Sequence, residues 1–254
     1  MTDASLPAHF TESEFRVGRV LNRTTSVLSR NFLIFFVVTA VAHLPALLLF
    51  KGSTSTGAST SGREIAIAMT MIVVGLILMI VLSTLSQAIV LYGAFQDMRG
   101  RQVSLSESLQ VGFSRFFPII RLAILMSLLG MLAALAFIIP AFIVFTMWFV
   151  ATPIVVVERL GAWASMKRSS QLTKGHRWKI FGLMVLLIMA SGIASQTISA
   201  SLTAIGGTPL ALVGDLIWNG VWGAFYAISV VVTYHDLRAA KEGVDIDQIA
   251  SVFD

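Results

Sequence analysis

Few residues in this chain have the types and spacing that catalysis or metal binding requires. The sequence has no Cys and four His, which excludes thiolate ligands and Cys nucleophiles. His9 and His176 lie in polar segments, and neither has a second metal ligand at helical spacing. The sequence also has no His-x-Glu pair, no Gly-rich phosphate loop and no Gly-x-Ser-x-Gly turn. We therefore expect no cofactor, no metal site and no enzymatic activity.

A second group of polar residues lies within or at the ends of long apolar runs, where such side chains are functional candidates. His43 lies 13 residues after Arg30, about 20 Å along a helix, and close to Pro45. A neutral His43 bonded to nearby backbone is the favoured interpretation, and a proton relay is the alternative. We expect Asn219 to share a hydrogen bond or a water with Asp215, and structural roles for the whole group. Its members are His43, Gln87, Gln196, Asp215 and Asn219.

The strongest candidate for a binding surface is the polar segment from Glu158 to Lys179, between two apolar runs. It holds six Lys and Arg against one acid, with a Trp near each end. This pattern predicts an interfacial helix over 159–176 that lies on anionic lipid headgroups with its Trp residues at headgroup depth. The predicted lipid-contact residues are Arg159, Trp163, Lys167, Arg168, Lys174, Arg177, Trp178 and Lys179. A weak apolar stripe, formed by Leu160, Trp163, Ala164 and Leu172, would face the bilayer.

Composition places these segments in a membrane protein. Hydrophobic residues make up 56% of the chain and charged residues 12%, and the mean hydropathy is +0.86. Such a chain has too little polar surface to cover a soluble globule. The net charge of +5 would suggest nucleic acid in a soluble protein. Here the basic residues flank apolar runs, which indicates membrane orientation, with the bilayer and its anionic headgroups as partners and no nucleic acid.

The apolar runs predict an all-α polytopic bundle with six spans, since one span needs about 20 residues. The longer runs divide at Ile139-Pro140 and at Gly206-Gly207-Thr208-Pro209, where proline or glycine favours a turn. The whole chain is then a single membrane domain, 1–254. The expected spans are approximately 31–50, 65–95, 119–138, 141–157, 179–200 and 210–234, and an acidic tail follows over 244–254. Two stripes of small residues, 191–199 and 220–227, predict close contact between the last two spans.

The distribution of basic residues predicts the orientation. All but two of the 18 Lys and Arg lie in the N-terminal segment, in 96–121, in 158–179 or after Tyr234. The exceptions are Lys51 and Arg63, in the loop between the first two spans. By the positive-inside rule both termini are cytoplasmic, and the location is a bacterial inner membrane that the chain crosses several times.

Three units of similar pattern follow one another. Each begins with a polar helix, continues with a basic and an aromatic residue, and ends with an apolar hairpin. The expected interfacial helices are 11–30, 104–115 and 159–176, and the first two begin with the capping boxes Thr11-x-x-Glu14 and Ser104-x-x-Glu107. Each hairpin ends on an acid closely followed by arginine: Asp97-Met98-Arg99, Glu158-Arg159 and Asp236-Leu237-Arg238. Repeats that start and end on one side are parallel repeats about an axis normal to the membrane.

The last hundred residues resemble a known family. The motifs are Pro153-Ile-Val-Val-Val-Glu158, Ala164-Ser-Met-Lys-Arg168-Ser169, Leu172-Thr-Lys-Gly175, Trp178-Lys-Ile-Phe-Gly182, Tyr234-His-Asp-Leu-Arg238 and Lys241-Glu-Gly243. They resemble a bacterial family of six-helix membrane proteins related to the membrane domain of glycerophosphodiester phosphodiesterases. The resemblance implies a multi-span domain with its polar helices on the cytoplasmic side. It brings no established chemistry.

Two classes of function fit these patterns. The favoured one is a non-catalytic membrane protein that organises lipid, or a partner membrane protein, through its cytoplasmic interfacial helices. The alternative is a small transporter or channel with a site among the polar groups of the bundle, which would show broken helices and charges near the midplane.

Overall fold

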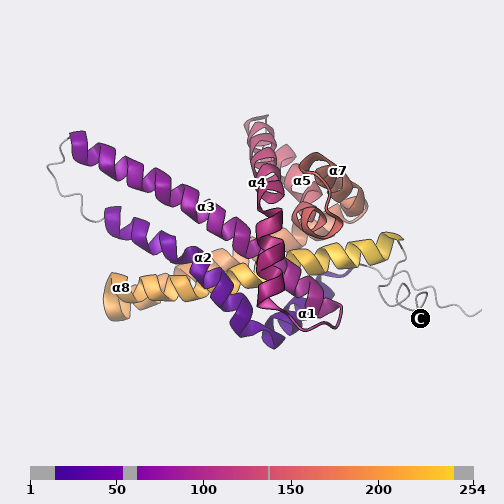
Figure 1. Cartoon of the computed structure of the whole chain (residues 1–254), viewed down its shortest axis with the longest axis horizontal. Helices are drawn as coiled ribbons and strands as arrows, with labels where there is room; N and C mark the ends of the chain where they lie inside the picture. The colour runs from indigo at the N-terminus through magenta and orange to yellow at the C-terminus, as the bar shows by residue number, and fades with distance from the viewer. Residues whose placement is uncertain (1–14, 54–61, 137, 243–254) are drawn as a thin grey trace, which may run out of the picture.

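The computed structural model describes residues 15–53, 62–136 and 138–242, and this part of the chain is helical with no strands (Figure 1). The all-α prediction is thus confirmed. The helices are α1 (Val17–Arg30), α2 (Phe32–Ser53), α3 (Gly62–Met98), α4 (Leu105–Ala136), α5 (Ile138–Met147), α6 (Ala151–Pro153), the π-helix η1 (Ile154–Glu158), α7 (Ala162–Thr173) and α8 (Arg177–Glu242).

Several of these helices could cross a membrane. Within the described residues, three are long and apolar enough, namely Ile65–Met98, Leu105–Ala133 and Arg177–Glu242, and α1 with α2 makes a fourth if that bent pair is counted. Large apolar side chains cover their outer surfaces, as Met71 and Leu135 show at 64% and 76% exposure. Apolar surface of this extent is stable in lipid and not in water. The chain is therefore a membrane protein. The sequence predicts six spans, but only three or four helices of the described residues are long and apolar enough to cross a membrane.

The first polar helix begins at Val17, so Thr11 and Glu14, with their predicted capping box, lie outside the described residues. Val20, Thr24 and Val27 on one face of α1 are buried. Beyond Asn31 the chain turns through 92° into α2. The bend follows from the two surfaces: α1 is apolar on one face and packs on the end of the bundle, while α2 is apolar all round.

The second unit has no such bend. The sequence predicts a polar helix over 104–115 and a separate span from 119, but α4 runs unbroken from Leu105 to Ala136 with Pro118 inside it. Packing on α3 explains the continuity, because Gly112 lies against Ile89 of α3, and Ile119 and Leu122 beyond Pro118 are buried as well. These contacts offset the hydrogen bond that Pro118 cannot make.

The predicted span 141–157 is broken. Helix α5 starts at Ile138, slightly before the predicted Ile139-Pro140 break, and ends at Met147. A turn then leads into α6 and the π-helix η1, which ends at Arg159 with a left-handed φ of 59°. Pro153 has no N–H to donate, so a regular helix cannot pass through it without losing a bond.

The last helix is a hairpin of two arms, residues 177–205 and 208–242. The backbone leaves helical geometry at Gly206 and at Gly207, whose φ is +69°, as the glycine pair predicts. The arms meet near the bend, where a Cβ on Gly214 would come within 2.0 Å of Leu202. Gly220, in the second of the two predicted stripes, packs against Phe36 and Ala40 of α2. Small residues allow close approach but do not specify the partner helix.

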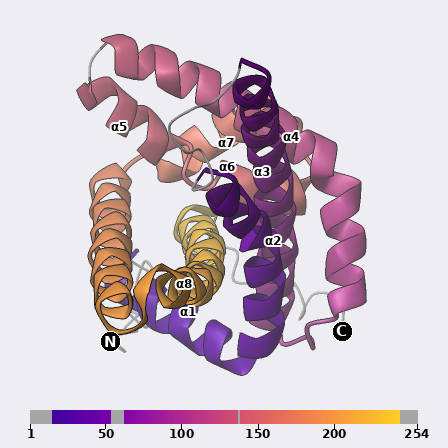
Figure 2. The same ribbon diagram turned by 90° about the vertical axis from the view of Figure 1, so that its left-hand side faces the viewer.

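The three helix pairs are α2 with α3, α4 with α5, and the two arms of α8. They meet at one end and separate at the other. In Figure 1 the ends of α2 and α3 and the bend of α8 lie on the left, while the α4–α5 tip lies at the top in both Figure 1 and Figure 2. Fully buried side chains concentrate where the three pairs meet and include Val90, Ile154, Ile228 and Tyr234. The second pair thus points away from the other two, and this shared end positions the polar sites.

Candidate functional site

Six of the eight predicted lipid-contact residues are exposed, on α7, on its flanking turns and on the first turn of α8. Trp163 is 67% exposed and Trp178 is 85% exposed, and Lys167 lies one helical turn from Trp163 on the same face. Aromatic and basic side chains side by side are typical of a membrane interface. The α7 surface, as we name it, consists of the exposed residues Arg159, Trp163, Lys167, Lys174, Trp178 and Lys179.

The opposite side of α7 is buried and carries small hydroxyl residues. Ser169 Oγ donates to the Met147 carbonyl at 2.8 Å, and Thr173 Oγ1 lies 3.4 Å from the same oxygen. Ser165, Ser169 and Thr173 are fully buried. The predicted stripe therefore does not form one face, because Trp163 and Ala164 are exposed as expected while Leu172 is buried. The missed signal was the spacing of four between Ser165, Ser169 and Thr173, which allows close helix contact.

Arg168 belongs to an internal cluster and not to the lipid-contact set. It donates to Glu158 at 3.3 Å and to Glu242, and Glu158 also accepts a bond of 2.8 Å from the Tyr234 hydroxyl. Burial disfavours the charged form of the Arg168 guanidinium. The two carboxylates stabilise that form more strongly, and the net effect raises the pKa of Arg168 above its ordinary value. Arg177 is also half-buried, with its Nε enclosed. Sequence position alone could not separate these two arginines from their exposed neighbours.

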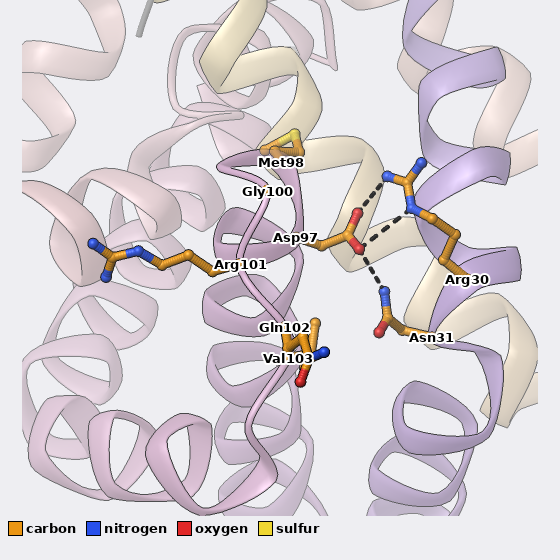
Figure 3. Close-up of a pocket in the computed structure, with 8 residues that line it drawn as sticks. All are labelled: Arg30, Asn31, Asp97, Met98, Gly100, Arg101, Gln102 and Val103. Atoms are coloured by element: carbon orange, nitrogen blue, oxygen red, sulfur yellow. Dashed lines mark hydrogen bonds and ion pairs between the residues drawn. The ribbon is translucent and has the colours of Figure 1, made fainter. Parts of the chain in front are cut away.

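Two further acids bind basic residues of the first unit. Asp97 at the end of α3 accepts bonds from Arg30 at 2.5 and 3.3 Å and from Asn31 at 2.8 Å, as Figure 3 shows. These residues line a hollow of about 660 Å³ between the α1–α2 bend and the loop before α4, from which Arg101 points away. Asp236 at the end of α8 lies 3.4 Å from Arg23 of α1.

Polar contacts connect each unit to the next, and the last unit back to the first. Near the end of α3, the Tyr92 hydroxyl donates to Glu107 of α4 at 2.6 Å. Glu158, at the end of η1, binds Arg168 of α7, and Asp236, at the end of α8, binds Arg23 of α1. Each hairpin end thus contacts the polar helix of the following unit, and the last contacts the first. The ring is closed by Arg23, which also lies 3.2 Å from His235 Nδ1.

The predicted intramembrane polar residues do not converge on one site. His43 Nδ1 lies 2.8 Å from the Thr39 carbonyl of its own helix, which agrees with the favoured backbone-bonded interpretation. Asn219 donates to the Asp215 carbonyl at 2.7 Å, and Ser199 Oγ reaches the Asp215 carboxylate at 3.5 Å. Gln196 is exposed on the first arm of α8. Asp215 therefore contacts the other arm of the α8 hairpin, whereas Asn219 bonds within its own arm.

Gln87 lines a cavity of about 120 Å³, the central cavity, where the three helix pairs meet. The other walls come from α4, from α5 and the turn after it, from α6 and from both arms of α8. Aromatic, Met and aliphatic side chains dominate, and four residues with polar tips join them. These are Gln87, Trp148, Thr152 and Tyr226. Hydrophobic periodicity did not find this cavity, because its walls come from units far apart in sequence.

The described part of the chain holds no group of three or more His, Cys, Asp and Glu that could bind a metal ion. The arrangement instead combines an aromatic and basic surface, a ring of polar contacts and a small cavity between the helix pairs. A search of curated proteins and a search of solved structures find no match. A family model described as a domain of unknown function, DUF7847, matches residues 15–237, which is most of the chain. The protein belongs to the DUF7847 family.

Proposed function

We propose that the protein is a non-catalytic integral membrane protein that gathers anionic lipid headgroups on the α7 surface and so organises lipid, or a membrane protein partner, at the cytoplasmic face. One observation carries the proposal: Trp163, Lys167, Lys174 and Trp178 are all exposed and lie on α7, on the turn after it and on the first turn of α8. The opposite face of α7 is buried against Met147, so the helix is held with this surface outward. Near an anionic leaflet each basic side chain contributes about 1 kcal/mol, and salt screens the attraction.

The orientation is part of the proposal. Both termini would lie in the cytoplasm of a bacterium, and six segments would cross the inner membrane, with each arm of α8 as one span. The charge distribution of the sequence supports this arrangement, and so does the break at Gly206 and Gly207. The likeness to the membrane domain of glycerophosphodiester phosphodiesterases stays a prediction.

A cysteine-labelling experiment tests the lipid contact, because the natural chain has no Cys. Ala164, exposed beside Trp163, is replaced by Cys and labelled with a polarity-sensitive dye in the full-length protein. The protein is placed in nanodiscs of phosphatidylcholine with or without phosphatidylglycerol. We expect a blue shift and reduced quencher access with the anionic lipid, and a loss of the difference at high salt.

The control variants separate this surface from positive charge in general. Lys167→Gln with Lys174→Gln should remove most of the lipid-dependent shift. Arg101→Gln with Arg121→Gln removes two exposed charges elsewhere and should leave the shift unchanged. Equal shifts with and without phosphatidylglycerol, or equal losses in both double variants, would show that the α7 surface does not select anionic lipid.

A further inference from the structure

We propose that the central cavity binds a small aromatic molecule that carries one hydrogen-bonding substituent and enters from the lipid. This ligand site is separate from the α7 surface. It is motivated by the lining of the cavity, because each of the three helix pairs contributes a side chain from the same position in its unit. Gln87, Trp148 and Tyr226 stand ten residues before Asp97, Glu158 and Asp236. Leu91, Thr152 and Val230 stand six residues before the same acids.

This position corresponds to the depth at which secondary transporters built from repeats hold their ligands. In the continuous helices α3 and α8, ten residues correspond to about 15 Å, half of a hydrocarbon core of about 30 Å. With the acids at the interface, as the proposed orientation has them, Gln87 and Tyr226 lie near the midplane. Ligand sites of such proteins lie near the midplane at the interface between repeats.

The walls fit an aromatic ring. Phe149 and Tyr226 meet edge to face with ring centroids 6.3 Å apart, and Phe145 and Trp148 add two more rings. Met126 and Met184 supply sulfur atoms, which make favourable contacts with aromatic rings. The volume of about 120 Å³ is similar to that of an apolar cavity of about 150 Å³ that holds benzene. A cavity of this volume suits a single six-membered ring.

The polar tips select a substituent. Within the described part of the chain no hydrogen bond engages the side chain of Gln87, Trp148 or Tyr226, so an amide, an indole N–H and a phenol remain for a ligand. Phe145 and Tyr226 are 40% and 36% exposed, which opens this region sideways toward lipid. A phenol-like molecule can pack on the aromatic walls and form hydrogen bonds with the polar tips. It also dissolves in the bilayer from which it would enter.

The test uses the full-length protein with 5-fluorotryptophan in lipid nanodiscs, and phenol as the probe. Substitution Trp148→Phe assigns the Trp148 resonance among the five Trp signals. We expect phenol to shift this resonance saturably while the Trp163 and Trp178 signals stay fixed. Tyr226→Phe and Gln87→Leu should each weaken phenol binding about 2- to 10-fold, the loss expected for one hydrogen bond, and should leave benzene binding unchanged.

Two cavity variants complete the design. Ala227→Leu fills the cavity and should abolish the saturable shift, whereas Ala190→Leu, on an exposed part of α8, should preserve it. If Ala227→Leu does not fold, Gln87→Leu still tests the site, because Gln87 is exposed and its replacement creates no clash. A shift that stays linear in phenol, an equal affinity for benzene and phenol, or a saturable shift in folded Ala227→Leu would each overturn the proposal. None of these outcomes bears on lipid binding by the α7 surface.

Discussion

At the scale of single residues, Glu158 links three elements. Its carboxylate accepts bonds from Arg168 of α7 and from Tyr234 of α8, while its backbone ends η1. Tyr234 is only 1% exposed, so its hydroxyl has no access to water as an alternative partner. A buried hydrogen bond to a charged group contributes more to stability than an exposed one, because an unpaired group keeps its full desolvation cost.

This contact gives a prediction with a matched control. We expect Tyr234→Phe to lower the free energy of unfolding by about 1.5–3 kcal/mol. Tyr92→Phe removes the same type of bond, from Tyr92 to Glu107, at a more exposed site and should cost less than about 1 kcal/mol. Reversible unfolding in detergent micelles measures both variants. Equal losses would show that burial does not determine the contribution of the Tyr234 bond.

At the scale of elements, the α8 hairpin depends on its bend. Gly207 has φ +69° and ψ −170°, a conformation that L side chains rarely adopt. The pairing of the two arms, in which Ser199 contacts Asp215 and Leu202 contacts Gly214, requires this geometry. The glycine pair is therefore a structural requirement of the hairpin.

Substitutions at two glycines of α8 should change stability in opposite directions. Gly207→Ala should destabilise the protein by about 1–3 kcal/mol, because the backbone there is strained for a residue with a Cβ. Gly182→Ala, in regular helix with open space around the new methyl group, should stabilise it by about 0.5–1 kcal/mol. Thermal unfolding of the purified full-length chain in one detergent gives both values. A neutral Gly207→Ala would contradict the requirement for left-handed geometry at the bend.

At the scale of the whole molecule, the ring of polar contacts joins the two ends of the chain. The pairs Tyr92–Glu107, Glu158–Arg168 and Asp236–Arg23 connect successive units, and the last returns to α1. The helix pairs separate beyond this ring, and the α4–α5 pair points in its own direction (Figure 1). The shared end thus holds the contacts between the units, and the membrane would set the orientation of the helix ends that lie beyond it.

The proposed six-span orientation predicts which positions are reached from outside the cell. In the Cys-free chain, Leu135→Cys and Thr208→Cys lie near the tips of the second and third pairs and should react with a membrane-impermeant maleimide in intact cells. Ser104→Cys and Ala240→Cys should react only after the membrane is permeabilised. If Thr208→Cys reacts and Leu135→Cys does not, the α4–α5 pair does not cross the membrane and the protein has four spans.

Sequence alone determined the class of this protein and its local turns. The uninterrupted apolar runs required helices in lipid, Gly206 and Gly207 placed the last bend, and Ser104 caps α4 as its spacing to Glu107 predicts. These features depend on a few neighbouring residues and on the solvent. The tertiary structure decided that α4 continues through Pro118, that Ser169 faces inward, and that Arg168 pairs with Glu158. It also brought Gln87, Trp148 and Tyr226 to one cavity. The face that a helix buries depends on partners far away in sequence, and local hydropathy holds no information about them.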